Sequence, residues 1–359
     1  MHIESIKITD LRLFRQLEIE PGPGFNAVVG PNGSGKTTVL EAVYLAGRGR
    51  TFRHQEAKPL VRKGADRGAV VCRIRNSVTG SISTLGVSQG KGGLEARLDG
   101  RDVAKRSELA AALPLLWIGS NPQTFLSGGP DVRRRFLDMG LFHVEHDYYR
   151  LLGEFSRILK QRNAALRQGR PSEVRVWDES LAAAGSAIDR ERRRFCEALM
   201  TGVLVDMAGI GIALAFRYHP GWRTNIGLKE QLHQRLERDM RYGHTSVGPH
   251  RAELAIELDG LPAERQLSRG QQKRLVFALN LSLWDLVNGS TGRAPVILID
   301  DLAAELDPKN RTDIMAALRA RGGQVFLTEI TPELVRDETT GRMFHVEHGV
   351  PPLQPAKGV

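Results

Sequence analysis

The sequence has 359 residues and is 41% hydrophobic, which is ordinary for a globular protein and leaves room for about two domains. Its two cysteines, Cys72 and Cys196, exclude a disulfide framework, and no stretch approaches the ~20 apolar residues of a membrane-spanning helix. We therefore expect a cytoplasmic protein without a membrane partner. The formal net charge of +10 favours a polyanionic partner such as nucleic acid, although an arginine-rich composition alone is the alternative explanation.

Short apolar runs separated by turns fill the first part of the chain and predict a strand-rich block. Residues 25–29 form the clearest predicted strand, which leads into a glycine-rich loop, and residues 37–46 have helical spacing. Further strands are expected at 3–8, 11–19, 69–75, 81–87 and 94–98.

A change of character follows over residues 131–241, where strand signals vanish and helical spacing takes over. A glycine and a proline within 168–171 predict a break between two helices, which we expect to pack as a hairpin or small bundle. The apolar seam of the arm is expected to cover only about three or four heptads before Gly202, Gly209 and Gly211 disrupt it, which excludes a very long coiled coil. We interpret this segment as an inserted helical arm.

Strand patterns resume after residue 243. An apolar helix is expected at 275–287, and the continuous apolar runs at 296–299 and 324–327 predict buried parallel strands with a helix at 312–321 between them. The sequence therefore predicts an α/β fold in which 1–130 and 242–348 form a head. The remaining ranges are the arm at 131–241 and a loose tail at 349–359.

The glycine-rich loop, GPNGSGKT at 30–37, matches the phosphate-loop pattern between a predicted strand and a predicted helix. Glycines let backbone N–H groups converge on phosphate oxygens, and the helix N-terminus adds its dipole. Lys36 is expected to reach the β- and γ-phosphates of ATP, and Thr37 to bind Mg²⁺. The predicted nucleotide-binding residues here are Gly30, Pro31, Asn32, Gly33, Ser34, Gly35, Lys36, Thr37 and Thr38.

Two carboxylates end the predicted strand VILIDD at 296–301. Asp300 is placed to bind Mg²⁺ through a water molecule, and Asp301 to polarise the attacking water as a catalytic residue beside Lys36. Aspartate is one methylene shorter than the glutamate common at this place, so slow turnover is expected. Helix capping is the alternative explanation for two acids at a strand end.

The element LSRGQQ at 267–272 has a use if a second copy of the chain closes over the first. Ser268 and the Gly270 amide would then bind the γ-phosphate held by the other subunit, whereas N-capping of the following helix is the alternative. The residues predicted to act in trans are Ser268, Arg269, Gly270 and Gln271, and Glu305 and Asp307 would line the same dimer seam.

Single residues carry weaker predictions. Gln123 could sense the nucleotide, with a solvated loop glutamine as the equal alternative. Thr328 occupies the place where many such ATPases carry a switch histidine. The arginines predicted to touch DNA phosphates are Arg133, Arg134, Arg135, Arg192 and Arg193, although internal ion pairs explain each one at least as well.

Together these residues resemble the RecF family of recombination mediators, which is related to the structural-maintenance-of-chromosomes ATPases. The resemblance extends beyond the ATPase motifs to GGPDVRRRFLD at 128–138, VWDESLA at 176–182 and SVGPHRAEL at 246–254. It implies an ABC-type ATPase head, with a mixed sheet around the phosphate loop and an antiparallel β subdomain, and an α-helical arm.

The resemblance also implies a weak DNA-stimulated ATPase that dimerises on ATP. It implies binding at gapped DNA and single-strand/double-strand junctions, with the partners RecO, RecR and RecA. Departures from the family pattern are Arg269, Ala303 and Ala304. Three other classes are alternatives: a transporter motor subunit, a nuclease head, and a structural DNA binder with a vestigial ATPase.

Overall fold

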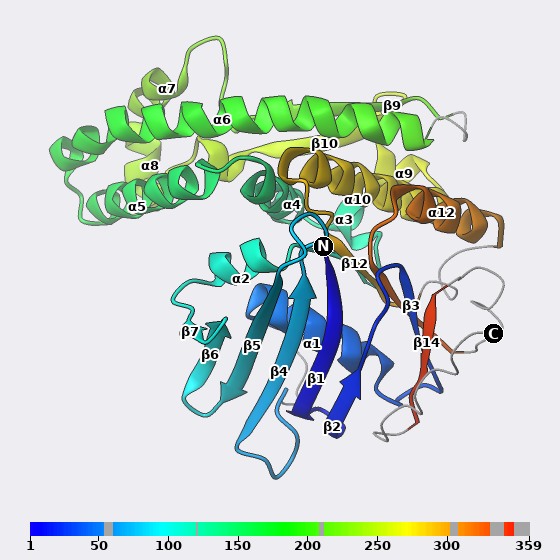
Figure 1. The fold of residues 1–359 in the computed structure, drawn as a ribbon. Coiled ribbons are helices and arrows are strands. Elements are labelled where there is room, and N and C mark those ends of the chain that lie inside the picture. Colours follow the sequence, from blue (N-terminus) through cyan, green and yellow to red (C-terminus); the bar gives the residue numbers. More distant parts are fainter. Residues whose placement is uncertain (54–59, 120, 208–211, 302–307, 331–340, 348–359) are drawn as a thin grey trace. The chain divides into compact units, whose positions relative to one another are not determined.

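The structure, a computed structural model, describes residues 1–53, 60–119, 121–207, 212–301, 308–330 and 341–347 (Figure 1). The chain divides into two compact units, one formed by Met1–Pro122 with Val287–Val359 and the other by Gln123–Leu286. The arm expected at 131–241 lies inside the second unit, which extends beyond it on both sides. The tail expected at 349–359 lies outside the described residues.

An antiparallel sheet of six strands, in the order β2-β1-β4-β5-β6-β7, forms one layer of the first unit. Alternation sets its faces: Ile6 and Ile8 of β1 are buried, while Lys7 between them is exposed. The strands are β1 (His2–Leu11), β2 (Phe14–Ile19), β4 (Arg67–Arg75), β5 (Ile82–Gly90), β6 (Gly93–Leu98) and β7 (Arg101–Asp102).

A parallel sheet of five strands, in the order β14-β3-β13-β12-β8, forms the second layer. Every residue of β3, β12 and β13 is buried, as in parallel sheets covered on both faces. Because the strands are parallel, the loops after β3, β12 and β13 begin at the same edge. The strands are β3 (Phe25–Val29), β8 (Leu115–Ile118), β12 (Val296–Ile299), β13 (Val325–Glu329) and β14 (Arg342–His345).

Helix α1 (Lys36–Arg48) packs against strands of both sheets and is buried continuously from Thr38 to Gly47 (Figure 1). A helix that is apolar all round belongs inside a core, and the core of this unit accordingly mixes residues of α1 with residues of both sheets. The mixed α/β head predicted from the sequence is confirmed. The other helices of this unit are α2 (Arg106–Ala112) and α12 (Pro308–Arg321).

The second unit is mainly helical. Helices α5 and α6 pack side by side as the predicted hairpin, with the break at residues 168–170 (Figure 1). Its helices are α3 (Thr124–Ser127), α4 (Pro130–Val144), α5 (Tyr148–Arg167), α6 (Pro171–Met207), α7 (Leu228–Gln234), α8 (Leu236–Tyr242), η2 (Pro249–Arg251) and α9 (Ala263–Gln266), with most of α10 (Arg269–Thr291).

Two expectations for the arm are wrong. Helix α6 and its buried face continue past Gly202 to Met207, so Gly202 does not disrupt the seam, while Gly209 and Gly211 lie outside the described residues. A Cβ at Gly202 would meet the Ser282 hydroxyl at 2.4 Å, so this glycine permits close packing. A strand, β9 (Leu214–His219), lies within the segment expected to lack strands, and it pairs with β10 (Glu253–Leu258), which also pairs with β11 (Leu261–Pro262). Leu214 is buried between exposed neighbours, which is the alternation of a strand.

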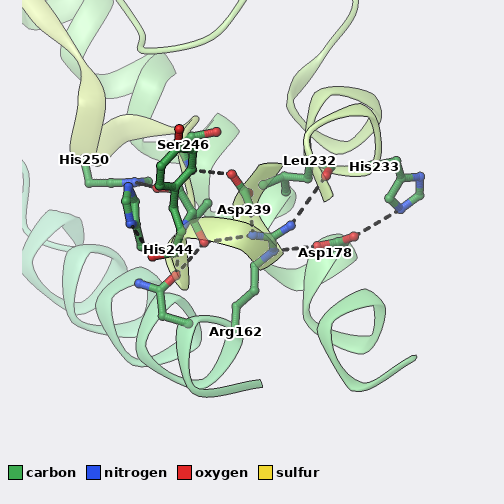
Figure 2. A network of polar contacts seen from close by, with 11 residues as sticks. Arg162, Asp178, Leu232, His233, Asp239, His244, Ser246 and His250 are labelled. Carbon is green, nitrogen blue, oxygen red and sulfur yellow. Dashed lines mark hydrogen bonds and ion pairs between the residues drawn. The ribbon is translucent and has the colours of Figure 1, made fainter. Parts of the chain in front are cut away.

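A buried arginine lies at the centre of the helical hairpin. The guanidinium of Arg162 donates to Asp178 at 2.8 Å, to Asp239 at 3.0 Å and to Thr245 at 2.9 Å (Figure 2). Arg162, Asp178 and Asp239 are at most 1% exposed. The network joins α5, α6 and α8, so these charges stabilise the arm only as a complete set.

Both cysteines are buried, and burial raises the pKa of the Cys72 and Cys196 thiols to about 12 each. Across the described part of the chain, none of the helices combines the length and the apolar character needed to cross a membrane.

Candidate nucleotide-binding site

The phosphate loop joins β3 to α1, and two of its glycines are required by shape. Gly30 has φ +154°, and a Cβ there would meet the Val346 carbonyl at 2.2 Å. Gly35 has φ +112°, and a Cβ there would meet the Phe14 ring at 2.6 Å. Any other residue at these positions would therefore push the loop away from its supports.

Lys36 is the first residue of α1, and its ammonium group turns back onto the loop. It donates to the Gly30 carbonyl at 2.7 Å and to the Pro31 carbonyl at 3.1 Å. Burial lowers the pKa of Lys36, while Asp301, Asp300 and Glu329 act in the opposite direction. A bound triphosphate would supply the anionic partners that a partly desolvated ammonium favours.

A chain of hydroxyl and carboxylate groups links helix α1, the end of β12 and strand β13 at the edge of the parallel sheet. Thr37 donates to Asp300 Oδ1 at 3.1 Å, and Thr328 donates to the same oxygen at 2.7 Å. The Thr328 hydroxyl also accepts the backbone N–H of Asp301 at 2.9 Å. The three predicted elements that contain Lys36–Thr37, Asp300–Asp301 and Thr328 therefore meet in one place.

These residues line a pocket of about 680 Å³ that lies entirely within the first unit. This volume falls within the range of small-molecule sites. Four cationic side chains and two carboxylates line it beside apolar residues. The lining residues are Arg12, Leu13, Asn32, Gly33, Gly35, Lys36, Thr37, Thr38, Arg53, Val61, Lys63, Asp300, Asp301, Thr328 and Ile330.

Asp301 has an unusual backbone. Its φ of +59° lies in the left-handed region, which aspartate tolerates better than most residues. The hydrogen bond from its N–H to Thr328 holds this conformation. Thr328 thus contacts the carboxylate of Asp300 and the backbone of Asp301, which is a larger role than its weak sequence signal indicated.

Ser268 directly precedes helix α10 in the second unit. The Ser268 hydroxyl accepts the Gln271 N–H at 3.3 Å, and the Gln271 side chain accepts the Ser268 N–H at 2.9 Å. This is a reciprocal capping box, so the capping interpretation is confirmed. Ser268 and Arg269 are nevertheless exposed, which leaves the N-terminus of a 23-residue helix accessible to an anion.

Gln123 and Ser34, which were also predicted to bind the nucleotide, are not among the residues that line the pocket. Gln123 precedes α3, and its side-chain oxygen is buried without a hydrogen bond to any residue that the structure describes. Ser34 is fully buried in the phosphate loop. Glu305 and Asp307 lie outside the described residues.

The structure gives most of the DNA-binding arginine candidates an internal role. Arg192 is only 2% exposed and donates to Asp138 at 2.8 Å and to the Pro249 carbonyl at 2.7 Å, so its assignment as a DNA contact is wrong. Arg133 pairs with both oxygens of Glu253, at 2.7 and 2.8 Å.

Of the three remaining arginine candidates, two are engaged by neighbouring groups and one is exposed. Arg134 donates to the Ala252 carbonyl and to Asp131 with a side chain that is 14% exposed. Arg193 pairs with Asp189 at 2.9 Å and lies over the Tyr218 ring. Arg135 is exposed. Of the five candidates, Arg135 is the one whose surface position best suits a phosphate contact.

Sequence reasoning missed several residues around the pocket. Arg12, Lys63 and Val61 line it although no motif marks them. Glu41 is fully buried on α1 and pairs with Arg12. A signal was present, because a glutamate within the apolar run VLEAVYL must find a partner when the helix is buried.

Known proteins resemble this chain over nearly its whole length. The model of the RecF/RecN/SMC N terminal domain matches residues 2–351. The DNA replication and repair protein RecF of Erwinia tasmaniensis is 38% identical over 361 residues, covering 99% of each chain. The RecF protein of Thioalkalivibrio sulfidiphilus is also 38% identical, over 97% of this chain and 98% of its own.

Solved structures share the fold. One described as the recombination mediator protein RecF-ATPrS in the RecFOR pathway has a TM-score of 0.85 and 25% identity, with 98% of each chain covered. An SMC head bound to the C-winged helix domain of ScpA has a TM-score of 0.59 and 16% identity, over 98% of this chain and 96% of that one. The chain therefore belongs to the RecF/RecN/SMC N-terminal domain family and, within it, to the RecF proteins.

Proposed function

We propose that this chain is an ATP-dependent DNA-binding protein of recombinational repair, whose heads dimerise on ATP and bind gapped DNA and single-strand/double-strand junctions. It would then help RecO and RecR to place RecA on single strands in the cytoplasm, as a weak DNA-stimulated ATPase. The observation that carries the proposal is the chain of contacts from Thr37 through Asp300 and Thr328 to Asp301 beside Lys36.

The residues present fit Mg²⁺. Thr37 gives its hydroxyl proton to Asp300, which leaves oxygen lone pairs of Thr37 for a metal. Hydroxyl and carboxylate oxygens with retained waters are the ligands that Mg²⁺ takes beside substrate phosphates. A bound Mg²⁺ would neutralise charge on the β- and γ-phosphates, while Lys36 holds the same oxygens from the loop.

Asp301 is the proposed base that orients the attacking water. Its N–H is fixed on Thr328, so the direction of its short side chain is set by the backbone. Aspartate extends less far than glutamate, which supports slow turnover. The hydrogen bond that fixes the Asp301 backbone is therefore compatible with catalysis.

The exposed N-terminus of α10 supports the dimer. A γ-phosphate bound in one subunit would accept hydrogen bonds from Ser268 and Gly270 of another copy only when two heads meet. ATP would thus bind the dimer better than the monomer and shift the population toward it. Hydrolysis at Asp301 would remove that preference and release DNA.

The test is DNA binding to a gapped duplex with and without ATP, for the wild type and Ser268→Arg. We expect ATP to tighten wild-type binding and the variant to lose this gain, because the arginine blocks the second head while the phosphate loop is intact. Equal binding by both proteins with and without ATP would reject the ATP-gated clamp and reopen the vestigial-ATPase alternative.

Loss of the helix cap needs its own control, because removing it costs about 1 kcal/mol. Ser268→Asn keeps a capping side chain, and Ser268→Ala removes the cap without adding bulk. Thermal unfolding of all three variants separates lost stability from lost dimerisation. Light scattering with Lys36→Ala gives a second reading, since ATP-dependent dimerisation that survives this change would contradict the proposal.

A further inference from the structure

The buried carboxylate of Glu41 lies on α1, the helix that begins with Lys36 and Thr37. Its two oxygens receive Arg12 Nε at 3.0 Å and Arg12 Nη2 at 2.9 Å. The Glu41 side chain is 0% exposed and the Arg12 side chain is 7% exposed. A bidentate pair of this kind fixes direction as well as distance, so Arg12 is held rigidly relative to the phosphate-loop helix.

The same carboxylate also holds the segment that follows α1. The Thr51 hydroxyl donates to Glu41 Oε1 and accepts the backbone N–H of Arg53 at 3.0 Å. Arg53 lines the nucleotide pocket, as Arg12 does. Glu41 is thus connected to two cationic residues of the pocket wall, to one directly and to the other through a single hydroxyl.

The backbone of Arg12 is held by a hydrogen bond as well. Arg12 has φ +54°, in the turn between β1 and β2, and its N–H donates to the Leu60 carbonyl at 2.9 Å. Arg62 in turn pairs with Asp10 at 2.6 Å. These contacts bring Val61 and Lys63 to the same pocket, so its wall is anchored both to α1 and to the turn.

We propose that Glu41 is a positioning residue of the nucleotide site, which ties Arg12 directly and Arg53 through Thr51 to the helix that begins with Lys36. This inference rests on the proposed ATP site. A polyphosphate held by Lys36 would then meet a second cationic side chain at a fixed place, without the cost of ordering it on binding.

A second contact at this segment provides the rival explanation. Phe52 stacks on Trp117 with ring centroids 3.8 Å apart, and this stack alone could hold the neighbouring residues. The rival makes the Thr51 hydroxyl dispensable, whereas the proposal makes it necessary. A substitution at Thr51 therefore separates the two without disturbing the buried ion pair.

The experiment measures Mg-ATP affinity by calorimetry for Thr51→Val, Thr51→Ser, Arg53→Ala and the double variant Thr51→Val/Arg53→Ala. We expect Thr51→Val to bind about five- to ten-fold more weakly, and Thr51→Ser to bind as the wild type does because it keeps the hydroxyl. The double variant should bind no more weakly than Arg53→Ala, because Thr51→Val acts by misplacing the Arg53 side chain, which Arg53→Ala already removes.

The results of four variants decide the outcome. Wild-type affinity for Thr51→Val, or a double variant that shows the product of the single losses, would overturn the proposal. Glu41→Gln should weaken Mg-ATP binding at least as much as Thr51→Val, and Thr51→Val remains informative if Glu41→Gln fails to fold. Unchanged affinity in Lys36→Ala would reject the ATP site itself, and with it this inference.

Discussion

The nucleotide pocket and the buried arginine network use similar side chains for different ends. In the pocket, Thr37, Asp300 and Thr328 contact one another at the open edge of the parallel sheet, beside a cationic lysine. In the helical hairpin, Arg162 and its two aspartates are sealed from solvent. Exposure decides the difference: charges that face a pocket can bind a ligand, whereas charges sealed from water cannot contact a ligand and act by holding other groups in place.

The largest effect is expected at the sealed network. Arg162→Ala would leave Asp178 and Asp239 buried without their cation, which costs about 3–5 kcal/mol of unfolding free energy. Urea unfolding measures it. Arg157→Ala, an exposed arginine on the same helix, should change stability by no more than about 0.5 kcal/mol. Equal losses for the two variants would contradict a special role for Arg162.

At the pocket we expect a substitution to reduce ATP turnover strongly and to change stability little. Asp300→Asn should reduce ATP turnover by about 10²- to 10³-fold, because an electrostatic contact to the metal site is lost. Its unfolding free energy should stay close to that of the wild type, since Asp300 lies beside a pocket rather than in a sealed core. Steady-state hydrolysis and urea unfolding measured on one preparation test both halves, with exposed Asp66→Asn as the control.

This contrast explains what the sequence could predict. The phosphate loop, the Asp300–Asp301 pair and the parallel strands were predictable because local spacing encodes them. Arg162 and Asp178 were not, because a charged residue on the apolar face of a helix is recognisable only when its partner is known. Asp239 lies 77 residues from Arg162, and no periodicity connects the two.

The same reason accounts for the arginine clusters. A run such as Arg133, Arg134 and Arg135 has one appearance in sequence, yet Arg133 reaches Glu253 across 120 residues and Arg135 is exposed. Long-range pairing removes a positive charge from the surface without a local signal. Counting arginines therefore overestimates the surface available to DNA.

A smaller effect is expected from His250, which lies beside the sealed network. Its Nε2 faces the Thr245 carbonyl at 3.0 Å, and burial lowers the pKa of His250 to about 4 from 6.5. Between pH 6.5 and about pH 4, His250 is protonated in the unfolded chain but neutral in the folded protein. Stability should therefore fall as the pH drops from about 6.5 toward 4, by about 3 kcal/mol in total.

The measurement is urea unfolding of the wild type and His250→Gln at pH 7 and pH 4.5. The variant should lose less stability between the two, because glutamine does not titrate and can still donate to the Thr245 carbonyl. His244→Gln, which replaces an exposed histidine nearby, should keep the wild-type acid sensitivity. An unchanged pH response in His250→Gln would reject the assignment.

The smallest effect is expected at Arg135, and it tests whether exposure separates ligand-binding charges from structural ones in the helical unit as well. Arg135→Ala should weaken binding to duplex DNA by less than about ten-fold and lower the salt dependence by about one phosphate contact. Its unfolding free energy should not change. Arg133→Ala should show the opposite pattern, with lost stability and a salt dependence like that of the wild type, because its guanidinium is engaged by Glu253 and three backbone carbonyls. If Arg133→Ala instead lowered the salt slope without loss of stability, the ion pair with Glu253 would have to open on DNA, and burial would no longer distinguish the two kinds of arginine.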